Sequence, residues 1–119
     1  MAKTITTTTD KLLTFKAMNG ADYELKDCVG KRIILNGVIQ FEKEEKEEVK
    51  TITILVDEDR NTYSTISPTI SDSVHRLCEV FCEYDADNDK YIFTECVPVI
   101  VIEKMSNNKR NFLSLDVDL

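Results

Sequence analysis

One segment, residues 32–42 (RIILNGVIQFE), constrains the fold more than any other, because its side chains follow the two-residue period of a β-strand. Its odd positions, from Ile33 to Phe41, form an apolar row, whereas its even positions are more mixed. This alternation predicts a strand with one face more buried than the other. Gly37 stands in the middle of the run and weakens a flat strand, so we expect a bulge or a sharp bend there.

The rest of the sequence favours a mainly β fold. Val, Ile and Thr account for 33 of the 119 residues, and β-branched side chains fit a pleated sheet. A helix is predicted from Pro68 to about Tyr84, because Ser67 is a good N-cap and apolar residues then recur at helical spacing. The charged segment 43–48 is predicted to be a hairpin loop. Further strands are predicted at 49–56, 62–66, 97–105 and 110–115, and strand character already returns at 91–93, ahead of the fourth strand.

Three strands, one helix and a final hairpin predict a five-stranded OB-type Greek-key barrel, with one α-helix between the third and fourth strands. A bend at Gly37 lets the first strand join both halves of the barrel, and no second helix is expected. The alternative is an open β-sheet with one helix on one face. We expect residues 31–115 to be the OB-fold domain, 1–30 an N-terminal arm and lead-in segment, and 116–119 a short acidic end.

The charge of the chain argues against a protein with a basic stripe for duplex DNA. The net charge is −7 and the pI is near 4.7. The acidic residues are concentrated at 42–48, at 83–95 and at the C-terminus, so the remainder is slightly basic and leaves room for a cationic face.

The sequence also predicts a cytosolic protein that does not enter a membrane. No apolar run reaches the roughly 18 residues that a membrane span requires. Residues 1–10 lack the apolar core of a secretory signal. The four cysteines are therefore expected to be reduced, and at least half of them buried.

Metal and catalytic motifs are incomplete. The segment 85–91 (DADNDKY) imitates the start of an EF-hand loop, but lacks Gly at the sixth position and Glu at the twelfth. His75, Cys78, Cys82 and Cys96 do not have the spacing of a zinc site. The chain has one histidine and neither a phosphate-binding loop nor a nucleophile elbow. We therefore predict a non-enzymatic protein without a metal or another cofactor.

Aromatic and basic residues on the predicted strands indicate a different chemistry. Single-stranded nucleic acid is held by rings that stack on bases and by cations that follow the phosphates. An OB barrel offers that surface on its second and third strands and on the loops beside them. Alternatively, Tyr63 and Phe112 are barrel wall or an oligomer interface. The candidate residues for single-stranded DNA are Arg32, Phe41, Lys50, Arg60, Tyr63, Lys104, Lys109, Arg110 and Phe112.

Over residues 31–115 the chain resembles the small single-stranded DNA-binding proteins of bacteriophages, especially those of phages that infect lactococci. The resemblance lies in GKRIILNGVIQFEKE, TITILVDEDRNTYSTISP and PVIVIEKMSNNKRNFLSLDV. It implies an OB fold, sequence-tolerant binding of single strands, and work in DNA replication or recombination. It also implies homo-oligomers (dimers or tetramers), phage or host replication and recombination proteins as partners, and the cytoplasm of the infected bacterium as the location.

Two hypotheses about function result. In the first, the protein coats and protects single-stranded DNA. In the second, it is an acidic β-barrel module that binds another protein, as a mimic of DNA. The second requires the acidic segments 42–48 and 85–89 to share one face.

Overall fold

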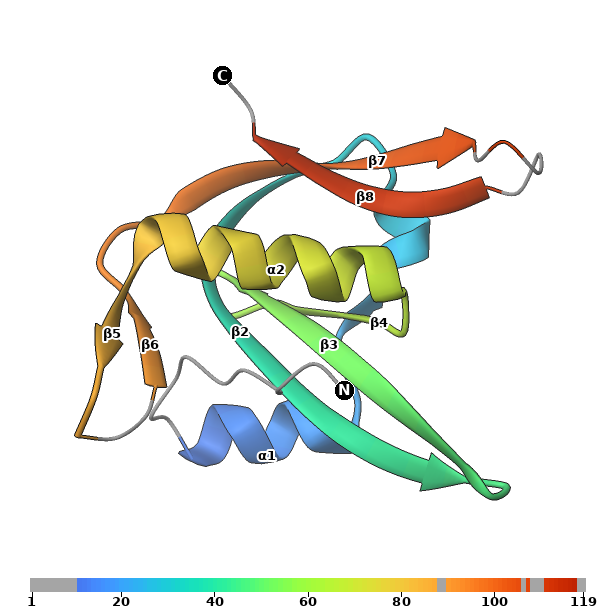
Figure 1. Cartoon of the computed structure of the whole chain (residues 1–119), viewed down its shortest axis with the longest axis horizontal. Helices are drawn as coiled ribbons and strands as arrows, with labels where there is room; N and C mark the ends of the chain where they lie inside the picture. The colour runs from blue at the N-terminus through green and yellow to red at the C-terminus, as the bar shows by residue number, and fades with distance from the viewer. Residues whose placement is uncertain (1–10, 88–89, 106, 108–110, 118–119) are drawn as a thin grey trace.

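The computed structural model describes residues 11–87, 90–105, 107 and 111–117 (Figure 1). It contains a six-stranded sheet in the order β1-β4-β3-β2-β7-β8 and a separate two-stranded sheet, β5-β6. The mainly β fold is confirmed. In chain order the elements are α1 (Lys11–Asn19), β1 (Tyr23–Glu24), η1 (Leu25–Cys28), β2 (Arg32–Glu45), β3 (Glu48–Asp57), β4 (Thr62–Thr65), α2 (Pro68–Phe81), β5 (Cys82–Asp85), β6 (Lys90–Phe93), β7 (Val97–Met105) and β8 (Asn111–Val117).

The six-stranded sheet is a curled half-barrel whose five main strands are compatible with an OB-type barrel. Strand β2 belongs to both halves: residues 32–35 pair with β7, and residues 35–45 pair with β3. Strands β4 and β8 would meet in a closed barrel, but the sheet pairs β4 with the short parallel strand β1 instead. The structure has more strands than predicted: β1 and β5 were not expected, and residues 91–93, where strand character was predicted, belong to the separate strand β6.

A bulge in β2 produces this double membership. The register with β3 shifts between Leu35 and Gly37, as the glycine led us to expect. The main core is the larger cluster of buried side chains, to which both the sheet and α2 contribute. Ile33, Leu35 and then Val38 belong to it, so the inward positions of β2 change from odd to even numbers. The single apolar row predicted for this strand is therefore wrong beyond the bulge. Ile39 belongs instead to a second cluster on the outer face of the sheet.

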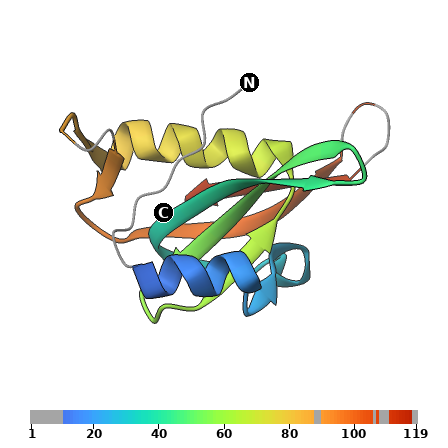
Figure 2. The same cartoon turned by 90° about the horizontal axis from the view of Figure 1, so that it is seen from below.

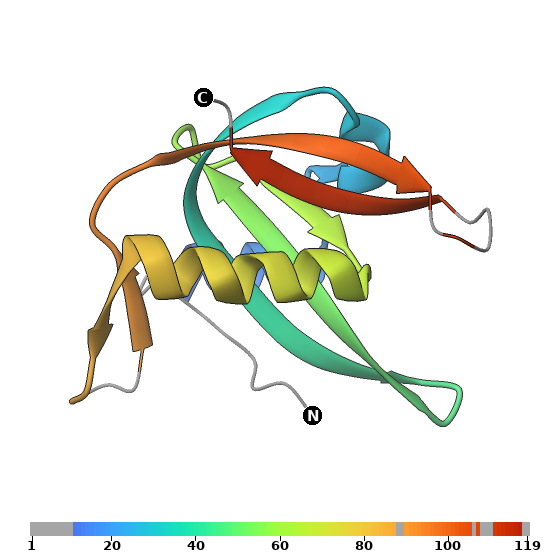
Figure 3. The same cartoon turned by 45° about the horizontal axis from the view of Figure 1, so that its top comes forward.

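Helix α2 lies against the concave face of the sheet (Figure 3). The Ser67 hydroxyl accepts a 3.4 Å hydrogen bond from the Ile70 amide, and Pro68 opens the helix, as predicted. Ile70, Val74 and Cys78 of this helix are fully buried, the first two of them in the main core. The helix ends at Phe81, three residues earlier than expected, because residues 82–85 form β5 and pair with β6.

Helix α1 was not expected, and the prediction of a single helix is wrong. Leu13 and Ala17 of this helix are buried against the outer face of β2 and β3, where Ile39, Ile54 and Val56 complete the second cluster. Figure 2 shows α1 lying across these strands. None of the helices that the structure describes is long and apolar enough to cross a membrane.

The segment that follows α1 runs from β4, near one edge of the sheet, to β7, near the other. After β1 pairs with β4, η1 places Leu25 and Cys28 in the main core. The Gly30 amide then donates a 2.7 Å hydrogen bond to the Val101 carbonyl on β7. Gly30 adopts φ of 86°, a backbone conformation that favours glycine.

Both hairpin predictions need a correction in length. Segment 43–48 was predicted to be a loop, but β2 and β3 continue through it to a two-residue turn at Lys46 and Glu47, with φ of 50° and 67°. The antiparallel pairing between β2 and β3 continues as far as Glu45 and Glu48, so most of the charged segment is strand rather than loop. Strand β8 likewise runs to Val117, past the predicted end at Leu115, because it stays paired with β7. The predicted loop at 106–109 lies outside the described residues except for Asn107.

Candidate nucleic-acid interface

Three candidate residues lie together on the outer face of β2, β7 and β8. Arg32 pairs with Ile100 of β7, and Lys104 pairs directly with Phe112 of β8. Ile100 and Lys104 lie four positions apart on β7, an even spacing, and their side chains therefore point to the same side of the sheet. The side opposite to the main core thus carries two exposed cations and one half-buried ring.

Phe41 and Lys50 occupy the same outer face at the other hairpin. The bulge in β2 causes this, because Arg32 and Phe41 would otherwise lie on opposite faces. Phe41 is half-buried at the edge of the second cluster, opposite Ile52. Since α1 covers Ile39 between them, the Phe41 region and the Arg32 region form two separate patches rather than one.

Lys50 has a second cation directly opposite it, Lys43 on β2. Side chains in this relation have Cβ atoms about 5 Å apart, and like charges at that distance destabilise the pair. A bound phosphate would remove this repulsion. The outer face of the β2–β3 hairpin therefore combines a ring with two cations before the acidic tip is reached.

The remaining basic candidates are less well placed. Arg60 is exposed in the turn between β3 and β4, with φ of 69°. Lys109 and Arg110 lie outside the described residues.

Tyr63 does not present its ring to solvent, since only 2% of the residue is exposed. Its hydroxyl donates a 2.9 Å hydrogen bond to Asp57 Oδ2. Burial, and then the bond to this carboxylate, raise the pKa of Tyr63 well above its ordinary value. Tyr63 therefore has the environment of a core residue, as the alternative interpretation proposed.

Tyr23 carries the exposed ring instead. The Tyr23 ring stacks on Tyr63 with 5.3 Å between the ring centroids and 23° between the planes, and Tyr23 is 48% exposed. Lys31 Nζ lies 5.1 Å from each of the two centroids. Sequence reasoning missed Tyr23 because only its parallel pairing with β4 brings it onto Tyr63, and no local pattern reveals that pairing.

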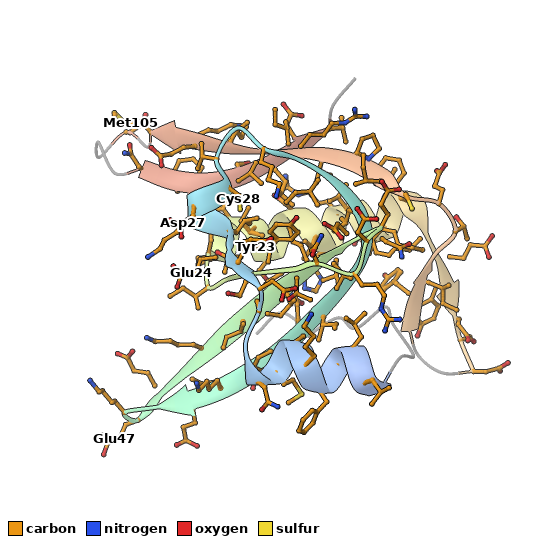
Figure 4. All side chains as sticks on the ribbon, turned by 180° about the vertical axis from the view of Figure 1, so that it is seen from behind. Tyr23, Glu24, Asp27, Cys28, Glu47 and Met105 are labelled. Atoms are coloured by element: carbon orange, nitrogen blue, oxygen red, sulfur yellow. The ribbon has the colours of Figure 1, made fainter. Side chains whose placement is uncertain are left out.

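Figure 4 shows where this ring lies relative to the two hairpins. Tyr23 and the rest of the β1–η1 segment lie between the hairpin that ends near Glu47 and the hairpin that contains Met105. OB barrels bind oligonucleotides between the corresponding loops. The stacked tyrosines are therefore at the position where such a ligand would enter.

The two long acidic segments do not share a face. The β2–β3 tip and the β5–β6 hairpin lie at opposite sides of the molecule (Figures 1 and 2). This separation disfavours the DNA-mimic hypothesis, although Asn88 and Asp89 lie outside the described residues.

The cysteine-rich end of α2 has no metal-site geometry. Burial raises the pKa of the Cys78 thiol, and burial also raises that of Cys82. All four cysteines are free thiols in the structure, two of them buried. His75 Nε2 is buried without a hydrogen-bond partner among the described residues. Within those residues no three His, Cys, Asp or Glu side chains are grouped as ligands.

A family model described as phage single-stranded DNA-binding protein, of the phi29 type, matches residues 2–118. No curated protein and no solved structure matches the chain. The family match spans almost the whole sequence and includes every strand of the candidate interface. The narrower resemblance to proteins of lactococcal phages stays a prediction.

Proposed function

The chain belongs to the family of phage single-stranded DNA-binding proteins, and from this premise we propose that it binds and coats single-stranded DNA during phage DNA replication and recombination. It does so by binding alone, without a chemical step. The family match over residues 2–118 is the observation that carries the proposal.

The geometry of the outer face supports this function. Rings at Phe41 and Phe112 stand beside cations at Lys50 and Lys104. A base stacked on an aromatic side chain contributes about 1–3 kcal/mol, and cations that neutralise phosphates add binding by counterion release. Neither contact depends on base identity, so the proposed binding is sequence-tolerant.

The overall negative charge limits the ligand to single strands. Duplex DNA carries a higher linear charge density and hides its bases, so that stacking contributes nothing. A protein of net charge −7 with only small cationic patches binds duplex weakly. We therefore expect strong preference for single strands over a duplex of the same sequence.

Fluorescence anisotropy with labelled oligo(dT) and a matched duplex tests the proposal. We expect a saturable increase with the single strand, weakened by added salt, and little change with the duplex. Absence of binding to the single strand at micromolar protein and low salt would disprove the function.

Self-association into a dimer or tetramer is part of the proposal. Its support is β8, the last strand of the sheet, whose outer edge pairs with no other strand in the described part of the chain. Such an edge is a template for a second strand. A two-fold axis at Ser114 would set Leu113 opposite Leu115 of a second copy, and both residues are only half-buried in one copy. Light scattering that gives the mass of a single chain at micromolar concentration would contradict self-association.

We also propose that the protein acts in the cytoplasm of the infected bacterial host, alongside phage or host replication and recombination proteins. In this proposal residues 31–115 are the main part of the binding domain, 1–30 a lead-in segment whose strand β1 and helix η1 complete the sheet edge and the core, and 116–119 a short acidic end whose first two residues still belong to β8. Deletion of only Asp118 and Leu119 leaves β8, which ends at Val117, intact. We expect this deletion to leave oligo(dT) affinity unchanged, so that a loss of partner binding can be assigned to the acidic end.

A further inference from the structure

We propose that Tyr23, supported by Tyr63 and flanked by Lys31, is a subsite for one unpaired base of the bound strand. The inference rests on the proposed function and adds a contact that the sequence did not indicate. Stacking on an exposed, fixed ring is how proteins hold single strands without reading sequence.

The exposure of the two rings defines their roles. Tyr23 is 48% exposed, whereas Tyr63 is 2% exposed and forms the inner layer of the stack. Within the described residues, Tyr63 is the ring that Tyr23 contacts. An arriving base therefore extends an existing two-ring stack by one member, and Tyr63 acts as a positioning residue that does not touch the DNA.

The position of the inner ring is fixed by hydrogen bonds. Tyr63 donates to Asp57 Oδ2 at 2.9 Å, and Asp57 Oδ1 accepts from the backbone amides of Asp59 and Asn61 at 2.9 and 2.8 Å. Tyr23 and Tyr63 are also paired in the parallel ladder between β1 and β4. A platform that is ordered before binding loses little conformational entropy when the base arrives.

Lys31 gives the subsite its charge. Its Nζ lies 5.1 Å from both ring centroids, which keeps the ammonium beside the stack by cation–π attraction. A phosphate next to the stacked base would then meet a cation that is already in place. This pairing of a ring with a cation is what a nucleotide requires from its site.

The two acidic residues that flank Tyr23 in the chain, Asp22 and Glu24, are already engaged with other partners. Asp22 Oδ2 accepts from the Thr62 amide and hydroxyl, at 3.1 Å each, and from Lys16 Nζ at 3.2 Å. The hydrogen bond from the Thr62 backbone amide is the largest of the effects that lower the pKa of Asp22. Glu24 lies 3.3 Å from Lys26 Nζ. These contacts reduce the repulsion that a phosphate would meet near Tyr23.

The chain offers a matched control, because Tyr84 is also exposed, at 55%, and also stands against a second tyrosine, Tyr91, at 5.4 Å between centroids. We expect Tyr23→Ala to weaken oligo(dT) binding by about 5- to 150-fold. Tyr84→Ala should change it by less than about twofold. Tyr23→Phe keeps the ring and should bind as the unchanged chain does.

Tyrosine emission provides an independent readout, because the chain has four tyrosines and no tryptophan. We expect oligo(dT) to quench this emission, and Tyr23→Ala to lose a part of the quenching that Tyr84→Ala retains. Equal melting temperatures of the variants show that the fold is intact. Should Tyr23→Ala unfold, photocrosslinking of the unchanged chain to bromodeoxyuridine-containing oligonucleotides replaces it, with an adduct expected on Tyr23.

The outcomes separate this subsite from the proposed function. If the unchanged chain fails to bind oligo(dT), the proposed function itself fails. If the unchanged chain binds but a folded Tyr23→Ala variant binds equally well, or adducts form only at other residues, the subsite is overturned and single-strand binding stands.

Discussion

Tyr63 and Asp57 are joined by a 2.9 Å hydrogen bond from the tyrosine hydroxyl to Oδ2 of the carboxylate. The bond links β4 to the turn that precedes it, and the same carboxylate accepts from Asn61 Nδ2 at 3.1 Å. Asp57 is buried, so its bonds are shielded from water. One acidic side chain thus fixes both the β3–β4 turn and the ring on which Tyr23 stacks.

Asp57→Asn should destabilise the fold. Burial raises the pKa of Asp57, but the hydrogen bonds, led by the Asn61 amide, outweigh burial and hold the pKa below its ordinary value of 3.8. Loss of charged acceptors for buried donors costs about 1–3 kcal/mol. Urea unfolding at pH 7 measures the difference. Asp59→Asn is the control, because this carboxylate is exposed in the same turn and should leave stability unchanged.

The effect of Asp57→Asn on stability should become smaller in acid. Because the folded-state pKa is lowered, the unfolded chain binds the proton first as the pH falls. The contribution of Asp57 to stability is therefore complete above about pH 4 and is lost as the pH falls through the folded-state value. The difference in unfolding free energy between the two chains, measured from pH 7 to pH 3, should shrink as the pH falls below about 4. A constant difference over this range would show that Asp57 acts through packing rather than charge.

Lys50→Gln should reduce both the affinity for oligo(dT) and its salt dependence. Each phosphate that a cation neutralises on a single strand contributes about 0.7 to the slope of log K against log salt. We expect the magnitude of the slope to fall by up to about 0.7 in this variant. Arg76→Gln removes one exposed positive charge from α2 and should leave the slope unchanged. If Lys50→Gln and Arg76→Gln give the same slope of log K against log salt, Lys50 does not contact the DNA.

Phe112→Leu tests whether the ring on β8 stacks on DNA. Leucine keeps apolar volume beside Lys104 but has no aromatic face. If Phe112 stacks on a base, affinity should fall by the equivalent of about 1 kcal/mol or more at unchanged melting temperature. If the residue is only a wall of the sheet, stability should fall and affinity should not. Anisotropy titrations and thermal unfolding of the same samples distinguish the two roles.

The sequence predicted those parts of the fold that local patterns specify. The period of β2, the costly Gly37 and the Ser67–Pro68 helix start each carry their signal within a few residues, and each was found. Which residues of β2 face the core beyond Gly37 could not be predicted. The bulge exchanges the inward and outward positions, and only the pairing of β2 with β3 shows where this exchange occurs.

The candidate site was harder to predict because its parts come from distant segments. Tyr63 has the sequence context of an exposed strand residue, yet Tyr23, forty positions earlier, covers it. Helix α1 gave no helical pattern because it is apolar on both sides: Leu13 is buried, while Leu12 and Phe15 are exposed. Contacts of this kind depend on the tertiary arrangement and leave no local period.

The neighbouring leucines of α1 allow a direct test of how it is held. Leu13 is 8% exposed against the second cluster, whereas Leu12 is 81% exposed. Leu13→Ala should lower the free energy of unfolding by about 2 kcal/mol or more, because it leaves a cavity over Ile54. Leu12→Ala should change it by less than about 0.5 kcal/mol. Urea unfolding of the two variants under identical conditions makes the comparison. If the two variants lose equal stability, α1 is not anchored to the sheet through Leu13, and the separation of the Phe41 and Arg32 patches by this helix would have to be abandoned.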